Sequence, residues 1–127
     1  MSNKVLIIGA YGLLGTSLSS HFSNEGFNVF KSGRRNFSEH ILDANDIYSL
    51  EKKINTLQPD YIINLAALTN VDICETDQSK AFSINTEIPK NISMLKNNYL
   101  FKFIHISTDQ VYQGKGPHKE LETNPIN

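Results

Sequence analysis

The sequence predicts an α/β fold in which a doubly wound parallel sheet carries helices on both faces, and three observations support this. Short apolar runs alternate along the 127 residues with longer segments that carry apolar residues at helical spacing. The first apolar run stops at a glycine, and two more glycines follow at intervals of three residues. No repeat or low-complexity segment interrupts this order. Because such alternation is typical of a parallel sheet with right-handed crossovers, we expect one domain over residues 1–127.

Five apolar runs predict the strands. Residues 5–8 are all apolar, which is typical of a central strand that is buried on both faces. Further strands are predicted at residues 27–30, 40–42, 61–65 and 101–106. After the last strand, the glycines and prolines between residues 113 and 127 predict a loop.

Three helices are predicted between the strands. The first follows the glycines and ends near Gly26, which can adopt the left-handed conformation of a helix end. The second covers residues 47–57 and ends before Pro59, because the residue ahead of a proline avoids helical backbone. The third covers residues 77–97, and Pro89 within it predicts a kink or a break.

Composition limits the classes of function. Twelve basic and thirteen acidic side chains give a net charge of −1, which argues against nucleic acid and anionic membrane surfaces as partners. No apolar stretch approaches the roughly 20 residues of a membrane helix. Cys74 is the single cysteine, so no internal disulfide forms and no zinc-type cysteine spacing exists. We therefore expect a cytoplasmic protein without a metal site.

The motif Gly9-x-x-Gly12-x-x-Gly15 lies between a predicted buried strand and a predicted helix, the context of a dinucleotide-binding turn. Glycines there permit a tight turn, close approach to a pyrophosphate and helix–strand packing. The helix N-terminus adds partial positive charge. The spacing is three and three instead of the commoner two and three, and a purely structural glycine turn is the alternative. We expect NAD(P) to contact Gly9, Tyr11, Gly12, Leu13 and Leu14.

The residues after the second strand favour NADP over NAD. Folds that select NAD place an acidic residue there for the ribose hydroxyls, and none occurs between Val29 and Arg35. The strand is followed instead by Ser32, Gly33, Arg34 and Arg35, which we expect to form its exit loop. A guanidinium bonded to a 2′-phosphate is worth roughly 1.5–3 kcal/mol, or about ten- to hundredfold in preference. The alternative is a pair of solvated surface arginines, with NAD possible as cofactor.

Four motifs together resemble the extended short-chain dehydrogenase/reductase family, and within it the dTDP-4-dehydrorhamnose reductases. They are the glycine motif, Asn64-Leu65-Ala66-Ala67-x-Thr69 followed by Val71-Asp72, Ser107-Thr108-Asp109-x-Val111-Tyr112, and Glu122-Thr123-x-Pro125-x-Asn127. The resemblance implies the N-terminal, NAD(P)-binding Rossmann-like portion of an oxidoreductase of dTDP-rhamnose biosynthesis. Such an enzyme reduces a nucleotide-linked 4-keto sugar by hydride transfer.

The resemblance also implies positions around the cofactor. Asp43 and Ala44 would lie beside the adenine, and Ala66 and Ala67 would line the cofactor at the end of a strand, with Thr69 nearby. Small side chains at a carboxyl strand end leave room for a ligand, which makes the assignment physically reasonable. Close packing in the core is the alternative explanation for the two alanines.

Further residues acquire chemical roles through the resemblance. Thr108 matches the catalytic serine or threonine that hydrogen-bonds the sugar carbonyl or hydroxyl, although a threonine capping a turn is the alternative. Asn85 would have a structural or proton-relay role, or would simply lie on a helix surface. The family's general acid is a tyrosine with a lysine four residues later. Neither Tyr99 nor Tyr112 has this lysine, so we expect the pair beyond Asn127 and little activity from this chain alone.

Three other readings remain open on sequence grounds. The chain could be a non-catalytic module that binds a dinucleotide or a partner, part of a nucleotide-sugar epimerase, or a sheet scaffold without a ligand. If the chain is part of a longer enzyme, we expect the full-length enzyme to act on a nucleotide sugar. Truncation would then uncover residues 61–65, residues 101–106 and part of the face of Phe82, Ile88 and Leu95, so we expect self-association through this surface.

Overall fold

The computed structural model of the chain, which describes residues 2–108, contains a five-stranded parallel sheet in the order β3-β2-β1-β4-β5. The strands are β1 (Lys4–Ile8), β2 (Asn28–Gly33), β3 (His40–Ile41), β4 (Tyr61–Asn64) and β5 (Lys102–His105). All four neighbouring pairs are parallel. This order belongs to doubly wound dinucleotide-binding folds and confirms the predicted class.

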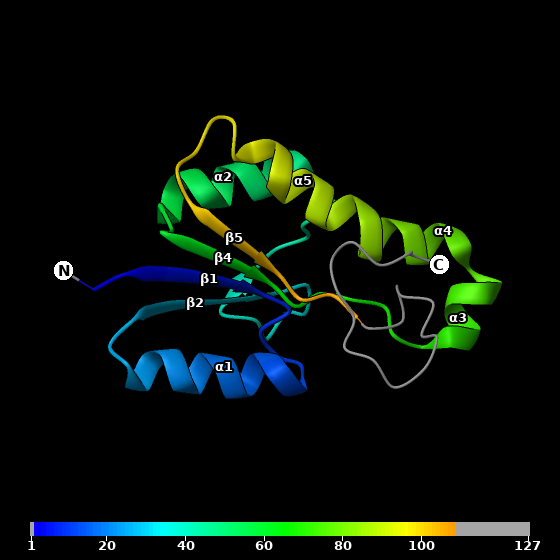
Figure 1. Ribbon diagram of the computed structural model, residues 1–127, viewed down its shortest axis with the longest axis horizontal. Helices are drawn as coiled ribbons and strands as arrows, with labels where there is room; N and C mark the ends of the chain where they lie inside the picture. The colour runs from blue at the N-terminus through cyan, green and yellow to red at the C-terminus, as the bar shows by residue number, and fades with distance from the viewer. Residues whose placement is uncertain (1, 109–127) are drawn as a thin grey trace, which may run out of the picture.

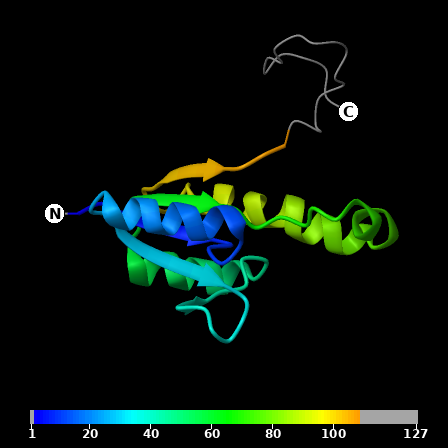
Figure 2. The same ribbon diagram turned by 90° about the horizontal axis from the view of Figure 1, so that it is seen from below.

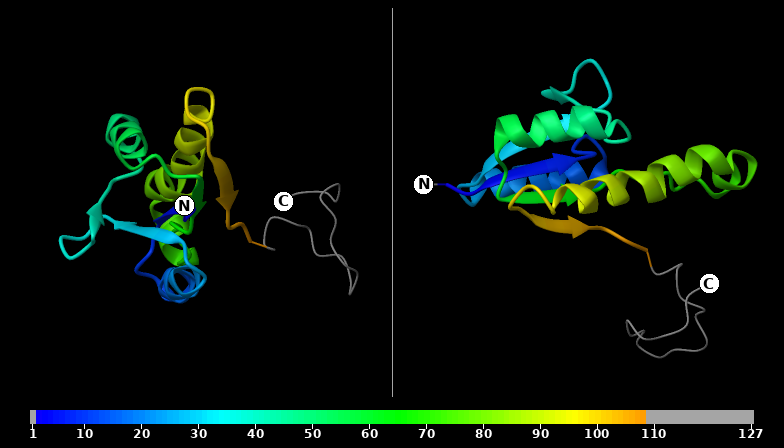
Figure 3. Two further views of the ribbon diagram at one scale, coloured as in Figure 1. Left: turned by 90° about the vertical axis from the view of Figure 1, so that its left-hand side faces the viewer. Right: turned by 90° about the horizontal axis from the view of Figure 1, so that it is seen from above.

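Helices cover both faces of the sheet (Figures 1 and 3). Helix α1 (Leu13–Asn24) lies on one face, and α2 (Ile47–Leu57) and α5 (Ile88–Leu95) lie on the other. Side chains alternate along β1, so Val5 and Ile7 pack on the α1 side while Leu6 and Ile8 join the larger core under α2 and α5. Burial on both faces explains why the first strand is apolar at every position after Lys4.

Two local signals set the ends of α2 as the sequence predicts. The carboxylate of Asp46 accepts hydrogen bonds from the backbone N–H of Tyr48 and from the Ser49 hydroxyl, which caps the helix. The Ser49 hydroxyl lowers the pKa of Asp46 below its ordinary value. At the other end Gln58 adopts a left-handed φ of 50°, immediately before Pro59.

The predicted long helix is interrupted, as Pro89 indicates. It consists of α4 (Gln78–Phe82), a π-helical turn η1 (Ser83–Glu87) and α5. Pro89 has no N–H to donate to the carbonyl of Asn85, and it lies in the first turn of α5, so the wider turn precedes it. In the part of the chain that the structure describes, no helix is long and apolar enough to span a bilayer.

Helix α3 (Val71–Thr76) is an element that hydrophobic spacing does not predict. The side chain of Asn70 caps it by accepting the N–H of Ile73, at 2.9 Å. Asn70 followed by Asp72 in the first turn is a helix-start signal that the sequence already contains. Helices α3 and α4 extend beyond the carboxyl ends of the strands (Figures 1 and 2).

Strand β2 is longer than the run of residues 27–30 predicts, and this corrects the expected exit loop. Ser32 and Gly33 belong to the strand, where Ser32 pairs in register with Ile8 and its hydroxyl donates to the Ile7 carbonyl at 3.0 Å. Pairing with β1 on one side and β3 on the other stabilises the two small residues in extended backbone. Arg34 and Arg35 are therefore the first residues beyond the strand.

The apolar surface that we expected to be uncovered is only partly exposed. Ile104 of β5 and Ile106 just after it are 45% and 44% exposed, and Phe82 of α4 is 56% exposed. The side chains of Ile62 and Ile63 in β4 are buried, and Phe103 packs on the core beneath α5. Ile88 and Leu95, which we expected to lose cover, are each only 4% exposed, because α5 packs against β5 and α2. Self-association through the remaining surface stays a prediction.

We expect Ile104→Lys to weaken any concentration-dependent association, because it places a charge in the centre of the exposed apolar surface of β5. Light scattering and sedimentation of the two proteins over a range of concentrations measure the effect. Leu100→Lys, at a fully exposed position just before the strand, is the matched control. A parent chain that stays monomeric at high concentration contradicts the prediction.

Candidate functional site

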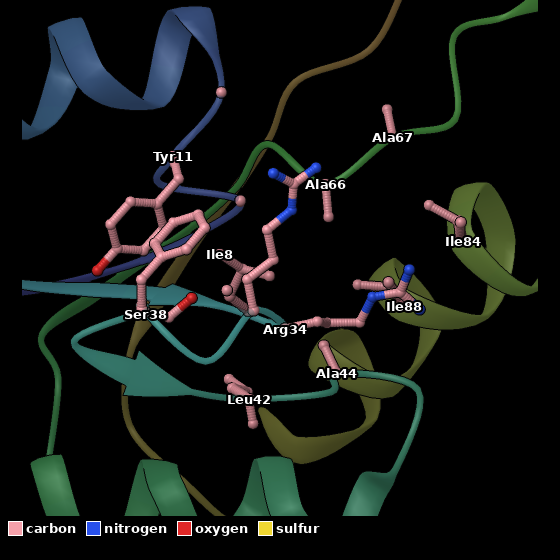
Figure 4. Close-up of a pocket in the computed structure, with 15 residues that line it drawn as sticks. Ile8, Tyr11, Arg34, Ser38, Leu42, Ala44, Ala66, Ala67, Ile84 and Ile88 are labelled. Atoms are coloured by element: carbon pink, nitrogen blue, oxygen red, sulfur yellow. The ribbon is translucent and has the colours of Figure 1, made fainter.

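A cavity of about 430 Å³ opens at the carboxyl ends of β1, β2 and β4 (Figure 4). Its walls come from the glycine turn, the loops after β2, β3 and β4, and the helix pair η1–α5. The lining residues are Ile8, Gly9, Tyr11, Gly12, Gly33, Arg34, Arg35, Phe37, Ser38, Leu42, Ala44, Ala66, Ala67, Ile84 and Ile88. This is the crevice in which open α/β sheets bind their ligands.

The three glycines have different roles. A β-carbon on Gly15 would lie 2.5 Å from the carbonyl oxygen of Gly9, so this glycine allows α1 to pack on the turn. Gly9 has a φ of +82°, and a β-carbon there would lie 2.9 Å from the backbone nitrogen of Ala66. A β-carbon on Gly12 would meet nothing closer than 3.8 Å. Only Gly12 therefore keeps open space, and it faces the cavity.

The turn is held by backbone hydrogen bonds. The N–H groups of Gly9 and Ala10 both donate to the Ser32 carbonyl, at 3.2 and 3.1 Å. Helix α1 then starts directly after Gly12 and has no acidic residue in its first turn. The first N–H groups of a helix lack partners within the helix and carry partial positive charge. The arrangement suits an anionic group such as a pyrophosphate.

Arg34 and Arg35 line the cavity, and no carboxylate occurs among its described lining residues. In Figure 4, Arg34 lies between Ser38 on one side and Ala44 and Ile88 on the other. The guanidinium of Arg35 stacks over the ring of Phe37 at 5.8 Å. This wall of the cavity is therefore cationic, as the sequence predicts.

The part of the lining next to Arg34 is apolar. Leu42 and Ala44 from the β3 exit face Ile84 and Ile88 from η1 and α5, a lining suited to a flat heterocycle. The side-chain amide of Asn91 fixes this exit by donating to the carbonyls of Ala44 and Asn45, at 3.0 and 3.1 Å. Ala44 thus lies where we expect the adenine. The carboxylate of Asp43 accepts the N–H of Asn45, and Asp43 does not line the cavity.

Asn64 holds the loop after β4, a role that sequence reasoning missed. It is completely buried, and its Oδ1 accepts the N–H of Ala66 at 3.1 Å. Its Nδ2 therefore points to Nδ1 of His105, 3.2 Å away. An asparagine that ends an otherwise apolar strand is the signal that could have identified it.

Asn85 is a structural partner of the same loop. Its Oδ1 accepts the N–H of Leu68 at 2.8 Å, and its Nδ2 donates to the Leu68 carbonyl at 3.0 Å. The amide thus pairs with both backbone groups of one residue, from a helical turn 17 residues away. Of the alternatives that the sequence left open, the structure supports the structural one, since Asn85 bonds to the loop after β4 and does not line the cavity.

Several predicted contact residues do not line the cavity. Leu13 is 94% exposed and Leu14 is 45% exposed on the first turn of α1. Thr69 and Thr108 are exposed beyond the ends of β4 and β5. Their assignment to cofactor or substrate stays a prediction. Tyr112 and the motif at residues 122–127 lie outside the described residues.

The sequence does contain one tyrosine with a lysine four residues later, which corrects the expectation that the chain lacks this spacing. Tyr48 and Lys52 are exposed on α2, and neither lines the cavity, so they do not provide the general acid of the site.

Tyr99, which lacks the lysine four residues later, is bound to α2. Its phenol donates a hydrogen bond to the Glu51 carboxylate at 3.2 Å. Burial and then the Glu51 carboxylate raise the pKa of Tyr99 above its ordinary value.

Comparison with known proteins gives this geometry a family. The family described as the RmlD substrate binding domain matches residues 3–127. The chain belongs to this family. A dTDP-4-dehydrorhamnose reductase of Aggregatibacter actinomycetemcomitans is 32% identical over 124 residues, which are 97% of this chain and 40% of that protein. A methionine adenosyltransferase 2 subunit beta of Bos taurus is 29% identical over 133 residues, covering 99% of this chain and 39% of that protein.

Solved structures include a family neighbour with a cofactor. The dTDP-4-dehydrorhamnose reductase of Bacillus anthracis in complex with NADP superposes with a TM-score of 0.80 at 31% identity, covering 92% of this chain and 40% of that one. This chain therefore spans about two fifths of the length of the relatives that it matches. The described part of this chain contains the whole glycine turn and the five-stranded sheet next to it.

We expect Gly12→Val to reduce NADPH affinity by about 10- to 100-fold, because a side chain at this position enters the cavity. The fold should persist, since Gly12 has ordinary helix-start backbone and no close neighbour. Gly15→Ala provides the contrast and should lower the free energy of unfolding by about 1–3 kcal/mol. Fluorescence titration and thermal melting separate the two effects. Unchanged affinity in folded Gly12→Val would show that the turn is only structural.

We expect Asn85→Ala to weaken NADPH binding several-fold, because both backbone groups of Leu68 lose their partner and the loop beside Ala66 loosens. Titration of the variant measures the loss. Asn55→Ala, an exposed amide on α2, removes the same group without touching the cavity and should bind like the parent. Equal affinities for parent and Asn85→Ala would remove the proposed link between η1 and the site.

Proposed function

We propose that this chain supplies the dinucleotide-binding part of an NADP-dependent short-chain reductase that acts on a nucleotide-linked 4-keto sugar. The observation that carries the proposal is that the glycine turn, Arg34, Arg35 and the apolar slot at Ala44 meet in one cavity. These parts fit the pyrophosphate, the 2′-phosphate and the adenine of NADP. The reductase activity named for family relatives supports the reaction class.

In this proposal each part of the cavity binds a different group of the cofactor. The open face of Gly12 and the N-terminus of α1 hold the pyrophosphate, while the arginines hold the ribose phosphate. Ala66 and Ala67 leave room at the β4 exit for the rest of the dinucleotide. When bound, the nicotinamide supplies the hydride for the sugar carbonyl. Thr108 follows β5, the strand beside β4, and we assign it to the sugar oxygen.

We expect NADPH to bind more tightly than NADH, and Arg34→Ala or Arg35→Ala to reduce this preference by about ten- to hundredfold. The 2′-phosphate is the only difference between the cofactors, so the affinity ratio isolates the contact. Lys52→Ala, an exposed cation on α2 outside the cavity, is the control for net charge. Equal affinities in the parent, or a ratio unchanged in both arginine variants, would contradict the assignment.

We expect the 127-residue chain to bind NADPH yet to reduce dTDP-4-dehydrorhamnose far more slowly than a complete family member. If the general acid lies outside this chain, as the resemblance implies, its absence alone costs about 10²–10⁴-fold in rate. Monitoring NADPH oxidation at 340 nm in the presence of the sugar, with a full-length relative alongside, measures the difference. A comparable rate would mean that a group within this chain donates the proton.

One relative favours a second function. The chain is 29% identical to a methionine adenosyltransferase 2 subunit beta, a relative that is named as a subunit of a different enzyme. A chain of this kind could hold a dinucleotide to stabilise a complex. If a full-length form of the chain bound NADPH but left every dTDP-4-keto sugar unreduced, the binding role would be preferred.

A further inference from the structure

Tyr11 points away from the glycine turn and towards the loop that carries the two arginines. Tyr11 lines the cavity, and its contact with the dinucleotide stays a prediction. Its hydroxyl accepts the backbone N–H of Glu39, 28 residues further along the chain. The ring meets Phe37 edge to face, with centroids 5.4 Å apart. Figure 4 shows Tyr11 and Ser38 on the same side of the cavity.

The loop of residues 34–39 has two other supports, of which one is an exposed ion pair between Lys31 of β2 and Glu39, 3.6 Å apart. Its backbone closes one turn, through the hydrogen bond from the Ser38 N–H to the Arg35 carbonyl at 2.9 Å. Arg35 stacks on Phe37, which in turn packs on Tyr11, so contacts run from the glycine turn to a guanidinium. Phe37 is itself 64% exposed and cannot fix the loop by burial. The contacts of Tyr11 thus connect the phosphate-binding turn to the cationic wall.

Gly33 makes this packing possible. A β-carbon on Gly33 would lie 2.8 Å from the Ser38 hydroxyl oxygen and 3.1 Å from Cδ2 of Tyr11. The missing side chain is therefore replaced by the Tyr11 ring and by Ser38, which is 8% exposed. Gly33 has no positive φ, so steric room alone explains the glycine. A side chain here would push the loop and Tyr11 apart.

We propose that Tyr11 is a positioning residue for cofactor selection: it holds the loop of residues 34–39 so that Arg34 and Arg35 face a phosphomonoester on the adenosine ribose. The inference rests on the proposed NADP site. The phenol does not need to touch the cofactor. It fixes the distance between the pyrophosphate site at Gly12 and the ribose-phosphate site, and this distance separates NADPH from NADH.

The test compares adenosine 2′,5′-bisphosphate with 5′-AMP, and NADPH with NADH, by calorimetry. Tyr11→Phe keeps the ring on Phe37 and removes only the acceptor of the Glu39 N–H. We expect it to weaken 2′,5′-bisphosphate and NADPH about 3- to 10-fold, while 5′-AMP and NADH change less than about twofold. Tyr48→Phe, on an 80% exposed tyrosine of α2, is the matched control and should change neither ratio.

Two further variants test the mechanism independently. Gly33→Ala displaces the same loop by steric contact and should lower the preference in the same direction. In an Arg34→Ala, Arg35→Ala background, Tyr11→Phe should cause no additional loss of preference, because its effect passes through the arginines. An additive loss there would overturn the positioning role.

The outcomes separate this inference from the proposed function. A parent chain that binds 5′-AMP as tightly as the 2′,5′-bisphosphate overturns the NADP site itself. A parent that prefers the 2′,5′-bisphosphate, with the same preference in Tyr11→Phe, keeps the NADP site and overturns the role of Tyr11. Equal weakening of all four ligands in Tyr11→Phe also overturns it, because that is the effect of general loosening. Thermal melting of each variant shows that the compared proteins are folded.

Discussion

The shape of the cavity depends on close contacts between main-chain atoms at the carboxyl end of β1. Gly9 lies against the Ala66 backbone, Gly15 lies against the Gly9 carbonyl, and one carbonyl of Ser32 accepts two N–H groups of the turn. Three strands and the start of α1 therefore meet at main-chain distance. Side chains can change rotamer, but main chain in contact with main chain cannot easily move. The floor of the cavity is consequently its most strongly constrained part.

Buried polar side chains transfer this constraint to the loops. Ser32 bonds to Ile7 within the sheet, Asn64 holds the β4 exit at Ala66, and Asn91 holds the β3 exit at Ala44. Each of these polar groups is paired with backbone, which is what makes its burial tolerable. Asn85 adds the same kind of support from η1, where Pro89 widens the helix. The walls of the cavity are thus held by amides and hydroxyls that do not themselves line it.

The β2 exit is the exception, and it carries the charge of the site. Its two arginines lie on a loop with a single internal turn, and the nearest support comes from Tyr11 on the glycine turn. The pyrophosphate site is held by main-chain contacts, whereas the loop is held by the side chains of Tyr11 and Lys31, so the two parts of the cavity differ in stability. Cofactor preference would then be easier to change than cofactor binding, since the loop can vary without disturbing the sheet.

The sequence by itself determined the class of the fold, the position of the glycine turn, the end of α2 before Pro59 and the break near Pro89. These features depend on neighbours within a few residues, where backbone sterics and hydrophobic period act directly. The sequence also showed directly that two arginines, and no acidic residue, follow the second strand. The family motifs identified Ala44, Ala66 and Ala67, which line the cavity.

Only the tertiary structure decided which residues meet. Strand β2 extends to Gly33 because β1 and β3 pair with it, and Tyr11 faces Glu39 because a residue 28 positions away supplies a partner. The Tyr48–Lys52 spacing has no catalytic meaning because α2 turns both side chains away from the cavity. Such outcomes depend on contacts between distant segments, and local pattern carries no information about them. The sequence therefore predicts the elements and the chemistry available, while long-range packing selects the groups that can use it.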